Sequence, residues 1–158
     1  MSTTSTINID ADLTSATSGD ITITSSSGAL TIADAKTFTS AGALTINSAS
    51  VSSTAATLST VGLITVSGAW TATGAVSMTS SANGITLNND VTLNGSGKNL
   101  VLSAKTADNA GTITLAHATH ALAASGDITI TGHTMATTQA TITANAALAM
   151  TFTATCTA

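Results

Sequence analysis

Residues 19–32 read GDITITSSSGALTI, and the first six letters return at residues 126–131 as GDITIT. Between these two segments the same phrase recurs with small changes, as GALTI (42–46), GLITV (62–66), GAVSM (74–78), NGITL (83–87) and GTITL (111–115). Each phrase is a glycine followed by aliphatic residues that alternate with a residue that is usually threonine. Alternation with a period of two is typical of a β-strand with one buried face and one exposed face.

The inward positions of these strands form one set of aliphatic residues. Most of them are β-branched, and glycine interrupts the pattern too often for a helix. We predict that the core is a ladder made of Ile21, Ile23, Leu30, Ile32, Leu44, Ile46, Ile64, Val66, Ile85, Leu87, Ile113, Leu115, Ile128 and Ile130.

Several of these strands recur about twenty residues apart, which is the signature of a solenoid. We therefore predict an all-β fold, a right-handed parallel β-helix (β-solenoid) of about seven coils and roughly 35 Å in length. Glycine, asparagine, aspartate and serine suit the corners between strands. Such corners are expected at SSANG (80–84), LNNDV (87–91) and NGSGKN (94–99). The alternative fold is a Thr-rich β-sandwich of the pilin-like kind.

Charge is scarce in this chain of 158 residues. Charged residues make up 6% of it, the net charge is −4, and Lys36, Lys98 and Lys105 are the only cations. Without a basic cluster the chain is not expected to bind nucleic acid. No apolar run is long enough for a membrane-spanning helix, and no secretory signal is visible in MSTTSTINIDADL at the start.

The stretch SGDITITSSSGALTIADAKTFTSAGALTI (18–46) resembles the repeats of filamentous-haemagglutinin-type adhesins. The resemblance covers about residues 19–131. It implies a right-handed parallel β-helix on a bacterial surface, so the expected location is extracellular or at the cell surface. The chain differs from this family because it is far shorter than the usual adhesin and has no obvious secretion domain.

The two ends of the chain suggest self-association. We expect a single β-solenoid domain over residues 1–158, with an N-terminal edge strand in 1–18 and an uncharged edge in 132–158 for subunit contact. Residues 128–158 contain no charge and no proline, so this edge has no protection against pairing. The predicted head-to-tail interface includes Ile7, Ile9, Met150, Phe152 and Cys156. Alternatively, ANAALAM (144–150) folds back as a helical cap and leaves a monomer.

The resulting functional hypothesis is a structural subunit that assembles head-to-tail into an extracellular filament, fibre or surface layer. Its main partner is a second copy of itself, and surface glycans are a further candidate. The alternatives are an adhesin or ice-binding module that uses threonine ladders, and a phage fibre segment. Ice binding requires Thr-x-Thr pairs that are stacked in register on one face. The distances between successive pairs along this sequence are irregular, which argues against ice binding. The pairs are Thr22/Thr24, Thr37/Thr39, Thr71/Thr73, Thr112/Thr114, Thr129/Thr131, Thr141/Thr143 and Thr151/Thr153.

The sequence predicts no catalytic residues, no metal site and no cofactor. Glutamate, arginine and tyrosine are absent, which removes most acid, base and anion-holding chemistry, so we do not expect an enzyme. His117 and His120 are three residues apart and would point to opposite faces of a strand. We expect them, and His133, to be isolated surface or corner residues.

Three smaller features complete the expectations. Asp20, Asp90 and Asp127 precede strands, where a carboxylate can bond corner amides. Trp70 is either a core residue or an exposed contact. Cys156 is either buried or links two subunits, and as the only cysteine it has no partner within the chain.

Overall fold

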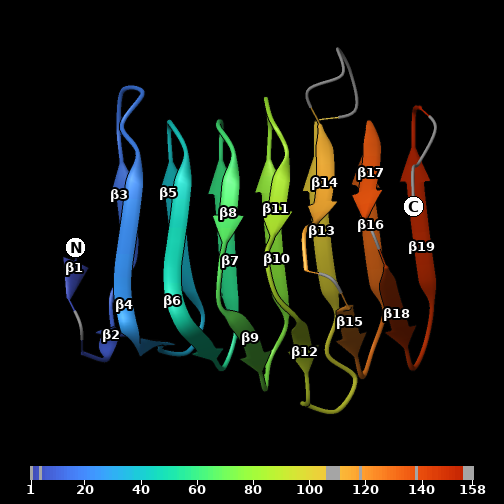
Figure 1. Cartoon of the computed structure of the whole chain (residues 1–158), viewed down its shortest axis with the longest axis horizontal. Coiled ribbons are helices and arrows are strands. Elements are labelled where there is room, and N and C mark those ends of the chain that lie inside the picture. Colours follow the sequence, from blue (N-terminus) through green and yellow to red (C-terminus); the bar gives the residue numbers. More distant parts are fainter. Residues whose placement is uncertain (1, 4, 106–110, 118, 138, 155–158) are drawn as a thin grey trace.

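The computed structural model describes residues 2–3, 5–105, 111–117, 119–137 and 139–154, and every regular element in these ranges is a β-strand. Figure 1 shows the strands stacked along a rod, with β1 and β19 at opposite ends. All strand pairs are parallel. The β-solenoid prediction is confirmed. The β-sandwich alternative is wrong, because such sandwiches are built from antiparallel sheets.

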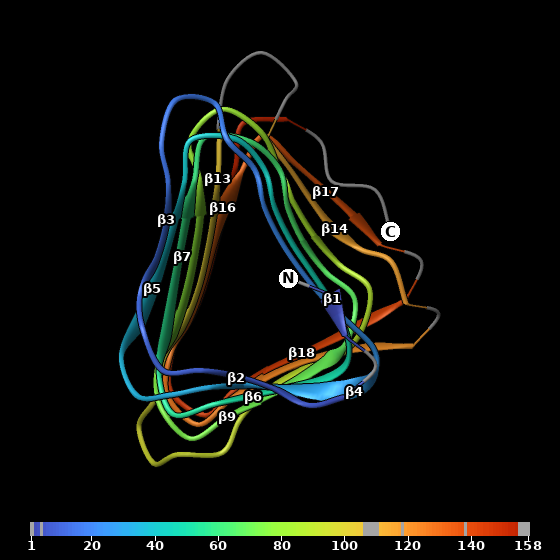
Figure 2. The same cartoon turned by 90° about the vertical axis from the view of Figure 1, so that its left-hand side faces the viewer.

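Seen along the rod, the chain traces a triangle with three faces (Figure 2). Face 1 contains residues 21–25 of β4 (Ile21–Ile32), residues 44–48 of β6 (Leu44–Ser53), β8 (Ile64–Val66), β11 (Ile85–Leu87), β14 (Thr112–Leu115) and β17 (Thr134–Thr137). Face 2 contains β2 (Ile7–Ile9), the second halves of β4 and β6, β9 (Ala69–Ala72), β12 (Val91–Leu93), β15 (His120–Ala124) and β18 (Ala140–Ala144). Face 3 contains β3 (Leu13–Ser15), β5 (Lys36–Ser40), β7 (Ala56–Thr60), β10 (Val76–Ser80), β13 (Leu100–Ala104), β16 (Ile128–Gly132) and β19 (Leu148–Phe152).

The seven strands of face 3 define seven coils. Coil 1 contains β1 (Ser2–Thr3), β2 and β3, and coil 7 contains β17, β18 and β19. Between them, coils 2 to 6 are β4–β5, β6–β7, β8–β10, β11–β13 and β14–β16. At the strand spacing of about 4.8 Å, seven coils give a rod of about 34 Å.

The coils differ in length, yet their strands stay in register. Leu58 pairs with Met78, twenty residues later, whereas Met78 pairs with Leu102, twenty-four residues later. The additional residues lie at corners, for example in the segment 94–99, which bulges outward between β12 and β13 (Figure 2). Unequal spacing in the sequence therefore does not prevent stacking.

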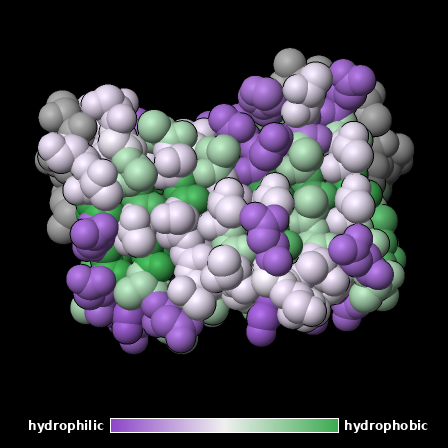
Figure 3. Space-filling view, turned by 90° about the horizontal axis from the view of Figure 1, so that it is seen from below, coloured by the Kyte–Doolittle hydropathy of each residue, from purple (hydrophilic) through white to green (hydrophobic). Residues whose placement is uncertain are grey.

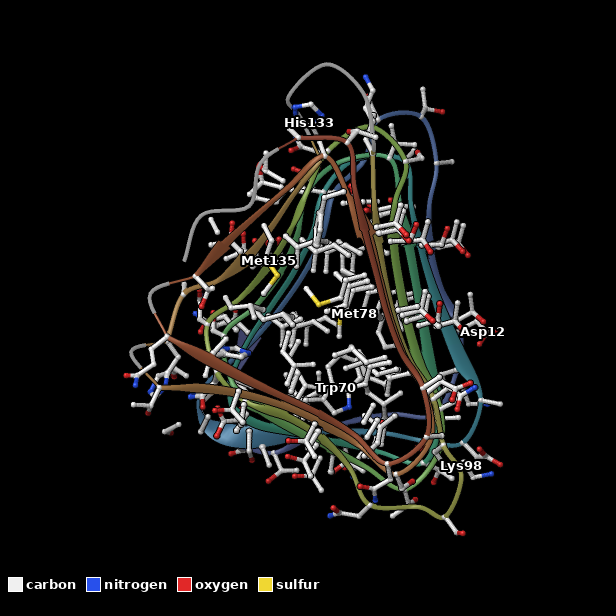
Figure 4. All side chains as sticks on the ribbon, turned by 90° about the vertical axis from the view of Figure 1, so that its right-hand side faces the viewer. Asp12, Trp70, Met78, Lys98, His133 and Met135 are labelled. Carbon is white, nitrogen blue, oxygen red and sulfur yellow. The ribbon has the colours of Figure 1, made fainter. Side chains whose placement is uncertain are left out.

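The core is the inside of the triangle. All residues of the predicted core ladder are buried except Ile21, which is partly buried at the N-terminal end. Figure 4 shows that Trp70, Met78 and Met135 also point inward, while Asp12 and Lys98 lie outside. Trp70 is a core residue, 1% exposed, and its Nε1 donates a hydrogen bond to Ser53 Oγ at 2.9 Å.

Buried hydroxyl groups occupy the inward position at the corner between faces 3 and 1. Ser40 Oγ donates to Gly19 O at 2.9 Å, and Thr60 and Ser80 both donate to Gly62 O at 2.7 Å. These hydroxyls give the corner carbonyls a partner, as buried polar groups require. The bonds of Ser40 and Ser80 join neighbouring coils, and the bond of Thr60 fixes its own corner.

Candidate functional site

Carboxylate and amide side chains at the corners bind the backbone of the next coil. Asp20 Oδ1 accepts the amide of Ala43 at 2.7 Å, and Asp127 Oδ1 accepts the amide of Ala147 at 2.9 Å. Asp90 Oδ1 accepts the amide of Ala121 at 2.8 Å. The prediction that these three aspartates bond corner amides is confirmed. Their role is structural, since each aspartate bonds the residue that occupies the same position in the next coil.

The outward side of face 3 carries two columns of hydroxyl residues in register. In the first column every coil contributes one serine or threonine. These residues are Thr14, Thr39, Ser59, Thr79, Ser103, Thr131 and Thr151. The second column begins in coil 2 and is hydroxylated in part, with Thr37, Thr57, Ser77, Val101, Thr129 and Ala149. From coil 2 to coil 4, and again in coil 6, the two columns form pairs of hydroxyls.

Faces 1 and 2 carry one such column each. On face 1 it runs through Thr22, Thr45, Thr65, Thr86 and Thr114. On face 2 it includes Thr31 and Ser52, whose hydroxyls are hydrogen-bonded at 3.3 Å. Figure 3 looks onto face 2 and shows pale residues of intermediate hydropathy over much of this side. Hydroxyl columns are thus a property of the whole surface, and only face 3 has two.

The seven Thr-x-Thr pairs do not lie on one face. Thr37/Thr39, Thr129/Thr131 and Thr151/Thr153 start on face 3, whereas Thr22/Thr24 and Thr112/Thr114 start on face 1 and the others on face 2. Irregular spacing was the wrong reason to doubt stacking, because the corners absorb it. The double column on face 3 was missed because serine replaces threonine in several coils, and a search that treated the two as equivalent would have found it.

The N-terminal end of the rod contains an apolar hollow of about 340 Å³. It is lined by Ile9 and Leu13 of coil 1, by Ile21 and Ile23 of coil 2, and by polar residues that include Asp20. The described part of β1 pairs only with Thr24 and Ser25, so residues 21–23 of β4 have no described strand on this side. The hollow is therefore the open end of the core.

The opposite end, coil 7, presents inward-facing residues to solvent. Leu148 is 49% exposed and Met150 is 42% exposed, although both continue columns that are buried in coil 6. Phe152 is partly buried. No described strand pairs with the far edge of β17, β18 or β19. The segment ANAALAM contains a corner and the start of β19, so the alternative of a helical cap is wrong.

The predicted interface residues differ in how much of their side chains is exposed at the ends of the rod. Met150 and Phe152 lie at the C-terminal edge, and Met150 is well exposed. Ile7 and Ile9 lie on β2 of coil 1, but each is only 4% exposed, so they offer a strand edge rather than side chains. Cys156 lies outside the described residues.

The histidines differ from expectation in one respect. His117 is exposed at a corner, and His133 is partly exposed and bonds Thr153 Oγ1 at 2.9 Å. His120 is 1% exposed in the core, so its expected place at the surface is wrong. It shares the inward phase of Leu122 and Ala124, which is the signal that could have revealed its burial.

Burial lowers the pKa of His120 below its ordinary value of 6.5. The carboxylate of Asp90 acts in the opposite direction, and His117 lowers the pKa further. Within the part of the chain that the structure describes, no three His, Cys, Asp or Glu side chains are placed to hold a metal ion. The same ranges contain no helix long and apolar enough to cross a membrane.

Comparison of the chain with family models, with curated proteins and with solved structures finds no match.

Proposed function

We propose that the chain is a structural subunit that assembles head-to-tail into an extracellular filament, fibre or surface layer. The observation that carries this proposal is the contrast between the two ends of the rod. Coil 7 exposes Leu148 and Met150, whereas the end at coil 1 has an apolar hollow lined by Ile9, Leu13 and Ile21. Contact between these two ends removes apolar surface of both from water, which favours association.

The strand directions of the two ends are compatible. On face 1 the outermost strands are β17 at one end and, at the other, β1 together with residues 21–23 of β4, which β1 leaves unpaired. On face 2 they are β18 and β2, and on face 3 they are β19 and β3. All strands within a face run parallel, so a second copy stacked on coil 7 continues the three faces in the same direction. Unpaired strand edges are templates for pairing with another chain.

The charge distribution favours head-to-tail contact over contact between two like ends. Asp10, Asp12 and Asp20 lie exposed around the N-terminal end, and two such ends would bring six carboxylates together. Residues 134–154, which include the described part of coil 7, contain no charged residue. A head-to-tail contact therefore has no like-charge repulsion, and because it does not close on itself it produces a filament.

The extracellular location and the role as a fibre or surface layer rest on the resemblance of residues 19–131 to adhesin repeats. The low charge and the hydroxyl columns support this role, because they allow rods to lie side by side without repulsion. The absence of catalytic function stays a prediction from composition.

Assembly should depend on the apolar edge of coil 7. Met150→Lys places a charge where the neighbouring copy would bury it, and we expect the filaments to disappear. The measurement is negative-stain electron microscopy with sedimentation velocity at neutral pH. Wild-type filaments should have an axial repeat near the about 34 Å expected for seven coils. Thr79→Lys is the matched control, since it adds the same charge in the middle of face 3, and it should leave the filaments intact.

Two outcomes would contradict the proposal. Wild-type protein that stays monomeric at high concentration would exclude self-assembly. Filaments of Met150→Lys that match those of the wild type would show that the contact lies elsewhere.

A second candidate function is binding to an ordered, hydrogen-bonding surface such as ice or a glycan layer. The observation that favours it is the double hydroxyl column on face 3, with about 4.8 Å between coils. We expect Thr79→Lys to abolish inhibition of ice recrystallisation, because a long charged side chain prevents flat contact. Thr71→Lys on face 2 is its control. A wild-type chain without effect on ice growth would remove ice from the candidate ligands.

A further inference from the structure

His120 is a buried titratable residue that neither proposed function uses. It begins β15 in coil 6 and points inward in phase with Leu122 and Ala124. Its side chain is 1% exposed, and neither Nδ1 nor Nε2 has a hydrogen-bond partner among the described residues. A neutral imidazole has one donor and one acceptor nitrogen, whereas the imidazolium has two donors and a charge. Protonation therefore makes an already unfavourable position worse.

The groups near His120 do not stabilise a positive charge by a hydrogen bond. From the β12 side, Asp90 is close enough to favour the charged form, but its Oδ1 accepts the amide of Ala121 and the imidazole has no bond to it. His117, in the corner before β15, disfavours a second positive charge. On the other side, β18 contains no titratable residue. Burial is the largest effect, and it holds the pKa of His120 below 6.5.

The position of His120 in the stack determines which part of the molecule responds. In a solenoid each coil contacts only its neighbours, so stability is a sum of local interfaces. Among the described residues, coil 7 is paired with coil 6 alone. If coil 6 opens, coil 7 loses its support, while coils 2 to 5 keep their mutual contacts.

We propose that His120 makes coils 6 and 7 an acid-sensitive segment, which opens at low pH while coils 2 to 5 remain folded. Above pH 6.5 the imidazole is neutral in both the closed and the open state, so this contribution to stability is fully present. Below pH 6.5 the open state takes up a proton and the closed state resists it, so stability falls until the pKa of the closed state is reached. The inference does not depend on assembly, because the proton binds within one chain.

Hydrogen exchange followed by mass spectrometry tests this inference on the full chain, at pH 7.5 and pH 5.0, below the concentration at which filaments form. After correction for intrinsic exchange, the opening constant of residues 112–152 should rise by up to ~30-fold between the two pH values. Residues 21–104 should change little. His120→Leu, which fills the core without a titratable group, should abolish the increase. His133→Gln, a partly exposed residue between β16 and β17, should retain it.

Three outcomes would overturn the inference. They are equal protection of residues 112–152 at both pH values, the same loss of protection in His120→Leu, or uniform opening of the whole rod at pH 5.0. If His120→Leu does not fold, His120→Met takes its place, and an NMR titration of His120 in the wild type gives an independent answer. A His120 pKa below 6.5 is expected there, and a value of 6.5 or above would refute the inference.

Discussion

Replacing Trp70 with alanine should lower the free energy of unfolding by about 3–5 kcal/mol. Trp70 lies on β9 in coil 4, in register with Val51 of coil 3 and Val91 of coil 5. Its side chain is 1% exposed, so truncation leaves a cavity between three consecutive coils. It also removes the Nε1 donor that bonds Ser53 Oγ at 2.9 Å, and Ser53 is only 8% exposed.

Urea unfolding followed by far-ultraviolet circular dichroism measures this effect without the tryptophan signal that the substitution removes. Thr71→Ala is the matched control, because Thr71 is the next residue on β9 and points to solvent. Its effect should stay within about 0.5 kcal/mol, as for most surface substitutions. Trp70→Phe keeps part of the volume and should fall between the two. A loss below about 1 kcal/mol for Trp70→Ala would mean that this side chain is not packed between the coils.

The architecture could be predicted from the sequence because burial repeats with a period of two. Pairs such as Ile64/Val66 and Ile85/Leu87 place two aliphatic residues on the same side of a short strand. A threonine separates the two aliphatic residues of each pair, so the pair faces the core and the threonine faces outward. Both pairs are buried. The coil count followed from the recurrence of these pairs.

Face 3 was harder to recognise because its inward positions are not all apolar. Phe38 and Leu58 are fully buried, yet the next inward position is Ser40 in one strand and Thr60 in the other. An alternation of phenylalanine or leucine with hydroxyl residues looks like a polar strand with one large residue. These hydroxyls are buried because corner carbonyls accept their hydrogen bonds. Thr60 donates to Gly62 O in its own corner, whereas Ser40 donates to Gly19 O at the corner of the preceding coil, twenty-one residues away in the sequence.

The ends and faces that could carry function were only partly predictable. The sequence placed Met150 at a predicted subunit interface because this edge contains no charge, and the side chain is 42% exposed. The burial of Ile7 and Ile9 depends on how coil 1 closes over the core, which no local pattern reveals. The double column on face 3 depends on the register of strands separated by corners of unequal length. Register is a property of the fold, so only the three-dimensional structure places Ser59 beside Thr39 and Thr79.

The corner between faces 3 and 1 depends on glycine, since neighbouring backbones approach closely there. Gly62 N donates to Gly42 O at 2.9 Å, which joins coil 3 to the next coil along the chain. A Cβ atom added to Gly62 would lie 2.8 Å from the carbonyl carbon of Gly42 and 2.9 Å from the nitrogen of Ala43. Backbone atoms cannot rotate away as a side chain does, so the two coils would have to separate.

Gly62→Val should therefore lower the free energy of unfolding by roughly 3 kcal/mol, at the upper end of the range for overpacking. A displaced Gly62 also weakens the two 2.7 Å hydrogen bonds that its carbonyl oxygen accepts, one from Thr60 in the same corner and one from Ser80 at the corner of the following coil. Val61→Ala is the matched control, because Val61 is the adjacent residue and 48% exposed, and urea unfolding should show a change within about 0.5 kcal/mol. If Gly62→Val were as stable as the wild type, the corner would have room for a side chain. The close stacking of coils at this corner would then not be a source of stability.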